Sequence, residues 1–209
     1  LMMKSQQSLL KKEEFFKLKD FFFSEKCAWH FRKHQTQNDD SFFAHTIFLE
    51  FQPCSPIWED IRPLIRKLDI KPEQLINIRA NLVLRKPEHK YSNFHIDCQS
   101  NEPFTTAIFY MNTCNGGTVF QDKTEIQSEE NKAIIFDGNT EHKAKSQRQK
   151  DKDPCKSVSL SGNEVVSCLC NVLVVYHGGN WAFIIEYGAA NARAAAAESR
   201  ATTSEQRLN

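Results

Sequence analysis

The sequence predicts a mainly β fold with helices near the N-terminus, that is, an α+β chain built around a β sandwich or barrel. Apolar residues recur at helical spacing over residues 8–23 and 58–68, but from residue 75 onward they alternate with polar residues. Short segments of strand character then follow one another closely. Antiparallel strands in this arrangement form sandwiches or barrels, of which the cupin-like jelly roll is one.

The N-terminal elements have distinct signals. Residues 8–23 place Leu and Phe three to four positions apart among strong helix formers, which predicts an amphipathic helix. Residues 40–51 are rich in Phe, Thr and Ile, which predicts a strand that ends before Pro53. Residues 58–68 repeat apolar side chains at helical spacing, with Arg and Lys on the other side. We expect both helices to pack on a sheet.

Turn residues separate the strands expected after residue 75. Asn115-Gly116-Gly117 predicts a tight hairpin, because glycine readily adopts positive φ. The segment 172–176 has the character of a later strand, whereas residues 188–209 are Ala-rich and polar and are expected to be disordered or a lone helix. We expect the strands of the central region at residues 75–85, 92–98, 105–112, 118–121 and 132–136.

Length and composition limit the classes of function. The 209 residues fit one domain. The net charge of +1 gives no overall positive potential that would attract nucleic acid or an anionic membrane. No apolar run approaches the length of a membrane helix and no signal peptide is visible, so we expect a cytoplasmic protein. The seven cysteines lack the paired spacing of a zinc site and are expected to be reduced. Because residue 1 is Leu, completeness of the N-terminus is left open.

A candidate metal site lies in His95-Ile96-Asp97 together with His142. Residues i and i+2 of a strand point to the same side, so His95 and Asp97 can bind one ion while Ile96 faces the core. Two imidazoles and one carboxylate bind Fe(II) on one face of an octahedron and leave the opposite face open for chemistry. The sequence therefore favours a non-haem Fe(II) site completed by His142.

The other possible ligands have weaker support. Cys98 follows Asp97 directly but points to the opposite side of a strand, and three ligands already complete the set. The remaining histidines have no carboxylate partner at strand spacing, and we expect them to be structural or solvated; they are His30, His34, His45, His89 and His177.

Several segments together resemble the 2-oxoglutarate and Fe(II)-dependent dioxygenases, most closely the small prolyl-4-hydroxylase-like members of phages and marine microbes. The resemblance spans residues 8–142 and is carried by residues 78–82, 94–97, 106–113, 115–120, 131–138 and His142. It implies a double-stranded β-helix in which His95, Asp97 and His142 hold iron. It also implies that 2-oxoglutarate and dioxygen are consumed while an unactivated C–H bond is hydroxylated. A peptidyl prolyl or similar side chain is the substrate that it favours, and an ascorbate requirement is left open.

The resemblance also implies residues for 2-oxoglutarate. Tyr110 matches a position whose phenol can bond the distal carboxylate, although packing inside the barrel is an equally good interpretation. A basic residue is expected about ten residues after the second His, because a cation gives the carboxylate both charge and orientation. Lys152 is nearest to that separation and Arg148 is close, but the segment 145–154 has the composition of a solvated loop.

The resemblance stops after Gln147. We therefore divide the chain into a dioxygenase-like domain at 1–156, with N-terminal helices within 8–70 and a core at 75–142, and an atypical segment at 157–209. One hypothesis is that the reading frame shifts, or a foreign sequence joins, just after Gln147; resequencing the DNA and finding an intact frame would refute it. If it holds, the barrel lacks its last strand or two and has an unpaired edge.

Three classes of function follow from these patterns. The leading class is an Fe(II)- and 2-oxoglutarate-dependent hydroxylase. The second is a catalytically impaired or truncated metal-binding relative, and the third is a cupin-like binding module in which the three ligands are a coincidence. The substrate could be a peptide, a protein or a small molecule, and neither its identity nor the oligomeric state can be inferred from the sequence.

Overall fold

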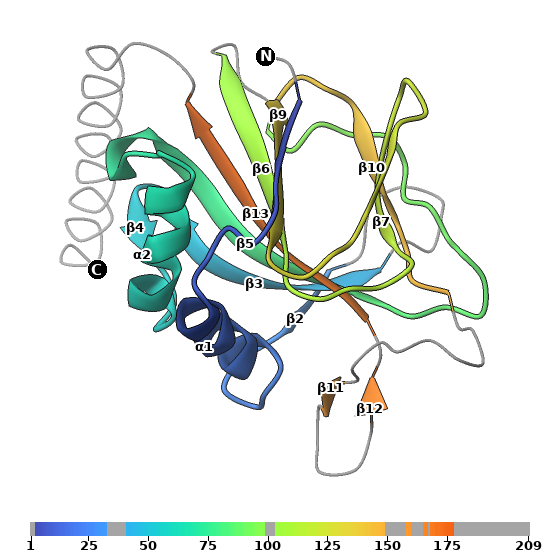
Figure 1. Ribbon diagram of the computed structural model, residues 1–209, viewed down its shortest axis with the longest axis horizontal. Coiled ribbons are helices and arrows are strands. Elements are labelled where there is room, and N and C mark those ends of the chain that lie inside the picture. Colours follow the sequence, from blue (N-terminus) through green and yellow to red (C-terminus); the bar gives the residue numbers. More distant parts are fainter. Residues whose placement is uncertain are drawn as a thin grey trace, which may run out of the picture.

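The fold is mainly β with two α-helices among the residues that the computed structural model describes, namely 3–32, 41–98, 103–148, 158–159, 165–166 and 168–177. Nearly all strand pairs are antiparallel. Figure 1 shows a large sheet with both helices on one of its faces and a small sheet opposite the other. The mainly β expectation with N-terminal helices is confirmed.

The large sheet has eight strands within this part of the chain, in the order β1-β9-β6-β13-β5-β3-β2, with β4 paired to β3. Every pair in it is antiparallel. Its strands are β1 (Lys4–Gln6), β2 (His30–Arg32), β3 (Phe42–Leu49), β4 (Gln52–Pro53), β5 (Leu75–Leu84), β6 (Phe104–Tyr110), β9 (Lys132–Asp137) and β13 (Cys168–His177).

The small sheet has the order β10-β7-β8 and is also antiparallel. Two further short strands, β11 and β12, pair only with each other among the described residues. The bounds of these strands are Gly117–Phe120 for β7, Glu125–Gln127 for β8, His142–Lys145 for β10, Val158–Ser159 for β11 and Val165–Val166 for β12.

Two helices cover the outer face of the large sheet (Figure 1). Helix α1 (Lys12–Phe22) buries Phe15 and Leu18, and α2 (Trp58–Lys67) buries Ile61 and Leu64. Both were expected, because their apolar side chains repeat at helical spacing. A short 3-10 helix, Pro72–Gln74, leads into β5. No helix in the described ranges is long and apolar enough to cross a membrane.

The central strands divide their side chains between two cores. On β6, Ala107 and Phe109 pack with the helices, whereas Ile108 and Tyr110 belong to a second core that faces the small sheet. Every residue of β6 is buried, since both faces of this strand are covered. The second core also includes Phe120 of β7, and it packs between the two sheets next to the site described below.

Strand β13 lies in the interior of the large sheet, whereas the hypothesis of a changed sequence after Gln147 implies that the last strand or two are missing. It lies between β5 and β6, and its register runs Val172 to Ala80 on one side and Val172 to Phe109 on the other. The strand expected at 172–176 is confirmed, and it lies in the middle of the sheet. Its apolar residues point alternately into the two cores, as expected for a central strand whose two faces are both covered. The expected domain boundary near residue 156 and the tail at 188–209 lie outside the described residues.

The segment 115–117 does not form the expected tight hairpin. Strand β6 pairs with β9 and β13, whereas β7 pairs with β8 and β10, so the chain crosses here from the large sheet to the small one. Neither glycine has φ in the left-handed region. Their role is close approach: a Cβ on Gly117 would lie 2.1 Å from the carbonyl oxygen of Ile126, and one on Gly116 would lie 2.7 Å from that of Lys145.

Candidate metal centre

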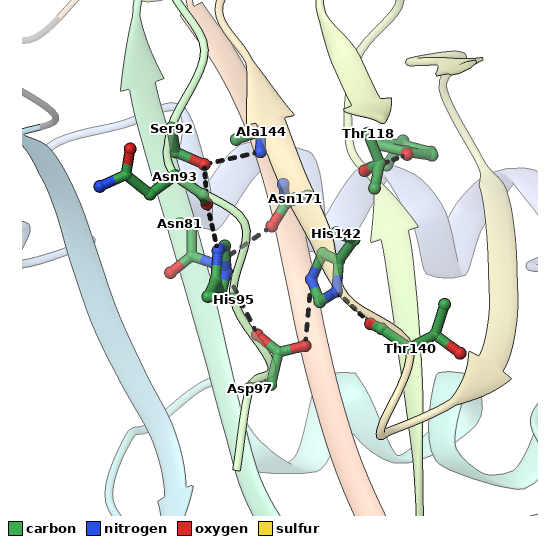
Figure 2. Close-up of polar contacts among 11 residues, drawn as sticks. Asn81, Ser92, Asn93, His95, Asp97, Thr118, Thr140, His142, Ala144 and Asn171 are labelled. Atoms are coloured by element: carbon green, nitrogen blue, oxygen red, sulfur yellow. Dashed lines mark hydrogen bonds and ion pairs between the residues drawn. The ribbon is translucent and has the colours of Figure 1, made fainter. Parts of the chain in front are cut away.

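Three side chains converge between the two sheets: His95, Asp97 and His142 (Figure 2). One ligand atom from each lies within 4.8 Å of the others. The Nε2 of His142 is 3.3 Å from Oδ2 of Asp97, and the Nε2 of His95 is 3.9 Å from Oδ1 of the same carboxylate. The structure thus brings together the two imidazoles and the carboxylate that the sequence predicts to act as ligands.

The backbone fixes the two histidines relative to each other. His142 begins β10, and the amide of each histidine donates to the carbonyl oxygen of the other, at 3.0 and 3.1 Å. The segment that carries His95 is not the regular strand expected at 92–98; it contacts β10 through isolated bridges at Tyr91 and His95. This irregular segment still places His95 and Asp97 on the same side of the backbone, as predicted from their spacing of two residues.

Each histidine has its other ring nitrogen tied to a backbone carbonyl. His95 Nδ1 lies 3.0 Å from the Asn93 oxygen, and His142 Nδ1 lies 3.1 Å from the Thr140 oxygen. A carbonyl only accepts, so Nδ1 carries the proton in both rings and Nε2 of the neutral ring presents its lone pair to the centre of the cluster. This second contact is the usual way in which a metal-binding histidine is oriented.

The carboxylate and the imidazole affect each other's proton affinity. Burial of Asp97 acts to raise its pKa, but the contact with His142 and the nearby positive groups outweigh burial and lower the pKa overall. Burial of His142 acts to lower its pKa, but the Asp97 carboxylate and the Thr140 carbonyl outweigh it and raise the pKa. Without a metal, the buried pair is therefore held as an ion pair.

One specific observation indicates that the side chains of His95, Asp97 and His142 suit a divalent cation. Oδ2 of Asp97 is buried, and its close partner among the described residues is Nε2 of His142, an ion-pair contact at 3.3 Å. A buried carboxylate oxygen needs a cation or a donor, and without a metal the protonated His142 is the cation that reaches it. A metal ion between Asp97 and the two Nε2 atoms would satisfy that oxygen and displace the His142 proton.

The three ligands open into a cavity of about 110 Å³ between the sheets. Its wall includes Ile108 and Thr118 from β6 and β7, and Leu173 from β13. Among the described lining residues the basic side chains are Arg79, Lys86 and Lys90, while the acidic one is Asp97. The cavity therefore has a positive balance even before a metal is bound, and it suits an anionic ligand.

The residues expected to bind 2-oxoglutarate differ in their position relative to the cavity. Tyr110 is fully buried and donates to Oγ1 of Thr118 at 2.7 Å, and it is Thr118 that lines the cavity. Burial raises the Tyr110 pKa, so the phenol stays protonated. Lys152 lies outside the described residues. Arg148 is described, but its backbone bonds the Asn115 side chain and it does not line the cavity.

The stretch before Arg148 corrects the expectation of a solvated loop from residue 145 onward. Ser146 and Gln147 are buried, and the Ser146 hydroxyl accepts from the Lys90 amide at 2.8 Å. The Gln147 carbonyl accepts from the Lys86 amide at 3.0 Å. These contacts tie the residues after β10 to the chain at the mouth of the cavity.

The other described histidines lie away from the cluster. His45 is buried, with Nδ1 at 2.9 Å from the Ala28 carbonyl and Nε2 at 2.7 Å from the Ser55 hydroxyl, so it is structural as expected. His89 contacts the Ser146 carbonyl, and His30 is exposed. His34 and the side chain of His177 lie outside the described part of the chain. Cys98 is a free thiol and does not belong to the cluster.

Three polar lining residues were not expected from the sequence to belong to the site: Arg79, Asn81 and Asn171. Arg79 and Asn81 occupy alternate positions on β5. Their alternation with apolar neighbours predicted a strand with one polar face, but it did not predict that this face lines a cavity. A polar side chain on a strand whose two faces are covered is the signal that could have identified them. Asn81 donates to Asn171 Oδ1 at 3.3 Å across the β5–β13 pair (Figure 2).

The fold is shared with several solved structures at low sequence identity. An oxidoreductase of the 2OG-Fe(II) oxygenase family from Burkholderia pseudomallei aligns with a TM-score of 0.59 at 10% identity, over 85% of this chain and 86% of that one. The α-ketoglutarate-dependent carbocyclase SnoK from nogalamycin biosynthesis aligns with a TM-score of 0.53 at 11% identity, over 84% and 79%. The epimerase SnoN from the same biosynthesis aligns at 0.51 and 9% identity, over 87% and 83%.

Sequence comparisons add no closer relative: no protein-family model matches the chain, and no curated protein matches it. At 9 to 11% identity the structural likeness shows a shared fold. The resemblance to the 2-oxoglutarate and Fe(II)-dependent dioxygenases is thus confirmed at the level of fold.

Proposed function

We propose that the chain is an Fe(II)- and 2-oxoglutarate-dependent dioxygenase that hydroxylates an unactivated C–H bond. The observation that carries the proposal is the cluster of His95, Asp97 and His142 at a cavity between the two sheets, in a fold shared with solved 2OG-Fe(II) oxygenases. The order β5-β13-β6-β9 facing β10-β7-β8 supports a double-stranded β-helix.

His95, Asp97 and His142 would hold the ion through the two Nε2 atoms and the carboxylate. When bound, Fe(II) with 2-oxoglutarate and dioxygen supplies an oxidation that yields succinate and carbon dioxide and hydroxylates the substrate. The chain itself contributes orientation, since the Asn93 and Thr140 carbonyls fix both imidazoles. It also excludes water with the apolar wall of Ile108 and Leu173.

The ligands proposed for this cavity have support in its chemistry. Its positive balance suits 2-oxoglutarate, a dianion. The epimerase SnoN, which shares the fold, has been solved in complex with Fe3+, alpha ketoglutarate and nogalamycin RO. We propose Tyr110 as a residue that acts on the co-substrate through Thr118, because its hydroxyl holds the threonine that lines the cavity. The proposed substrate, a peptidyl prolyl or similar side chain, rests on the sequence resemblance alone.

A second candidate is a metal-binding relative without turnover. The observation that favours it lies on β13, whose described side chains include no Lys or Arg, and whose cavity-facing residues are Asn171 and Leu173. If no cation meets the distal carboxylate of 2-oxoglutarate, the metal would still bind at His95, Asp97 and His142. Turnover would then fail for lack of an oriented co-substrate.

Succinate formation separates the two candidates. The purified protein is incubated in air with Fe(II), ascorbate and 2-oxoglutarate, and succinate is measured over time. Uncoupled decarboxylation above the Fe(II)-free background is expected for wild type and for His30→Ala, which removes an exposed histidine that belongs to neither the cluster nor the cavity lining. It is expected to be lost in Asp97→Ala. No succinate from wild type that still binds Fe(II) would favour the inactive relative.

A further inference from the structure

Arg79 is a half-buried cation whose Nε is enclosed by the fold. It lies on β5, in the middle of the large sheet, where its backbone is paired with Leu173 of β13 on one side and Thr46 of β3 on the other. Its neighbours Ile78 and Ala80 face the helix-side core, so the guanidinium is directed to the opposite face and lines the cavity. Burial lowers the pKa of Arg79, yet an arginine stays charged at any ordinary pH.

The guanidinium has no anion of its own in the described part of the chain. Its Nε is buried without a hydrogen-bond partner, and its nearest aromatic contact is the ring of Phe42, 5.8 Å from Cζ. Asp97 favours the charged form of Arg79 from a distance, but the ion pairs of Asp97 are with His95 and His142. An enclosed guanidinium nitrogen left in this state is costly unless a ligand supplies the missing acceptor.

The remaining polar groups of the wall do not replace Arg79. Lys90 is exposed, so water screens its charge. Lys86 is half-buried like Arg79, but it offers one compact ammonium group, and that group is not an enclosed donor without a partner among the described residues. On β13 the neighbouring wall position is Asn171, whose side-chain oxygen already accepts from Asn81. Among the described cations of the wall, Arg79 is therefore the one that combines an enclosed, unused donor with a position on the same cavity as the three ligands.

We infer that Arg79 is the anchor for the distal carboxylate of 2-oxoglutarate, so that β5 supplies the basic group in place of the expected Lys152. The inference rests on the proposed function. A planar guanidinium can grip a carboxylate through two parallel N–H donors, which fixes orientation as well as charge. One dicarboxylate would then satisfy two groups at once: its 2-oxo acid end completes the metal site, and its far end satisfies the guanidinium.

A pair of 2-oxo acids tests this assignment. 2-Oxoglutarate and 2-oxopentanoate share the chelating end and the chain length, but 2-oxopentanoate ends in a methyl group. Both are titrated anaerobically into the Fe(II)-loaded protein, and the dissociation constants are read from the charge-transfer band of the chelate. The variants are Arg79→Met, Arg79→Lys and the control Arg66→Met, which removes an exposed arginine on α2. Fe(II) affinity and the melting temperature are measured for each.

Wild type and Arg66→Met are expected to prefer 2-oxoglutarate over 2-oxopentanoate. Arg79→Met is expected to lose that preference, with 2-oxoglutarate weakened about tenfold to a hundredfold and 2-oxopentanoate nearly unchanged. Arg79→Lys is expected to be intermediate, because it keeps the charge but not the two-pronged geometry. If Arg79→Met does not fold, Arg79→Lys alone carries the test.

Two failures can be told apart. An Arg79 variant that binds Fe(II) and keeps the full wild-type preference would overturn the role of Arg79 while leaving the proposed function intact. Failure of wild type itself to form the chelate with 2-oxoglutarate would overturn the proposed function, and the anchor with it.

Discussion

The Nε2 atom of His142 lies 3.3 Å from Oδ2 of Asp97, and the Nδ1 atom of the same ring is held by the Thr140 carbonyl 3.1 Å away. The imidazole is therefore fixed at both ends before any ligand arrives. Because His95 is held in the same way by Asn93, little reorganisation is needed when a cation replaces the His142 proton. These contacts give a physical basis for several measurements.

Divalent metal should stabilise the folded protein through Asp97. A ligand that binds only the folded state adds about 2.7 kcal/mol when its concentration is a hundred times its dissociation constant. We expect Mn(II) or anaerobic Fe(II) to raise the melting temperature and a chelator to reverse the rise. Asp97→Asn should remove the shift, because it replaces the anionic ligand by a neutral amide. An equal shift in Asp97→Asn would place the metal elsewhere.

Metal affinity should rise with pH in the range where His142 titrates. The Asp97 carboxylate and the Thr140 carbonyl outweigh burial and raise the His142 pKa, so a proton competes with the metal below that value. In the apoprotein the protonated His142 adds stability below its unfolded pKa, and this is lost as pH rises through the folded pKa. We expect affinity to increase by up to about tenfold per pH unit and then level off. A calorimetric titration across pH with no such slope would contradict this.

The sequence was most informative for features that depend on local rules, namely the period of the side chains and the chemistry of the possible ligands. The alternation on β5, the helical spacing of α1 and α2, and the spacing of His95 and Asp97 each reflect a local rule, so those elements and the cluster around Asp97 could be predicted. Strand partners are set by the whole sheet, which explains why the crossing at Gly117 was mistaken for a hairpin.

The position of β13 in the sheet and the position of Arg79 on the cavity were missed for a related reason. The strand character of 172–176 was visible, but only the β5 and β6 edges determine that it fills the slot between them. Likewise, the sequence marks Arg79 as one polar residue in an alternating strand, and its position on the cavity follows only from the arrangement of both sheets. The short strands β1 and β8 have weak patterns and are stabilised mainly by their partners β9 and β7.

His45 and His95 should respond to mutation in opposite ways. His45→Ala leaves the Ala28 carbonyl and the Ser55 hydroxyl without their partner inside the fold, so we expect a loss of about 1–3 kcal/mol in unfolding free energy. Its metal affinity should stay at the wild-type value. His95→Ala should abolish tight metal binding with a smaller effect on apoprotein stability, because that ring is partly exposed. Denaturant unfolding and metal titration of both variants would test the distinction; loss of metal binding in His45→Ala would contradict it.

Strand β13 should be required for folding. Val174 is fully buried between β5 and β6, so a carboxylate there has no solvent and no partner. We expect Val174→Asp to cost at least about 3 kcal/mol or to prevent folding. The control Leu49→Asp changes a residue that is 42% exposed and should alter stability by less than about 0.5 kcal/mol. A Val174→Asp variant that unfolds at the wild-type denaturant concentration would mean that β13 is dispensable.

The central claim is that His95, Asp97 and His142 form one Fe(II) site at which 2-oxoglutarate is chelated. The most direct measurement is the visible charge-transfer absorption that appears when 2-oxoglutarate is added anaerobically to the protein with one equivalent of Fe(II). We predict that wild type and His30→Ala develop the band, that it saturates at one 2-oxoglutarate per iron, and that His95→Ala and His142→Ala do not develop it. A folded wild type with no band, or a band that persists unchanged in His142→Ala, would contradict the account.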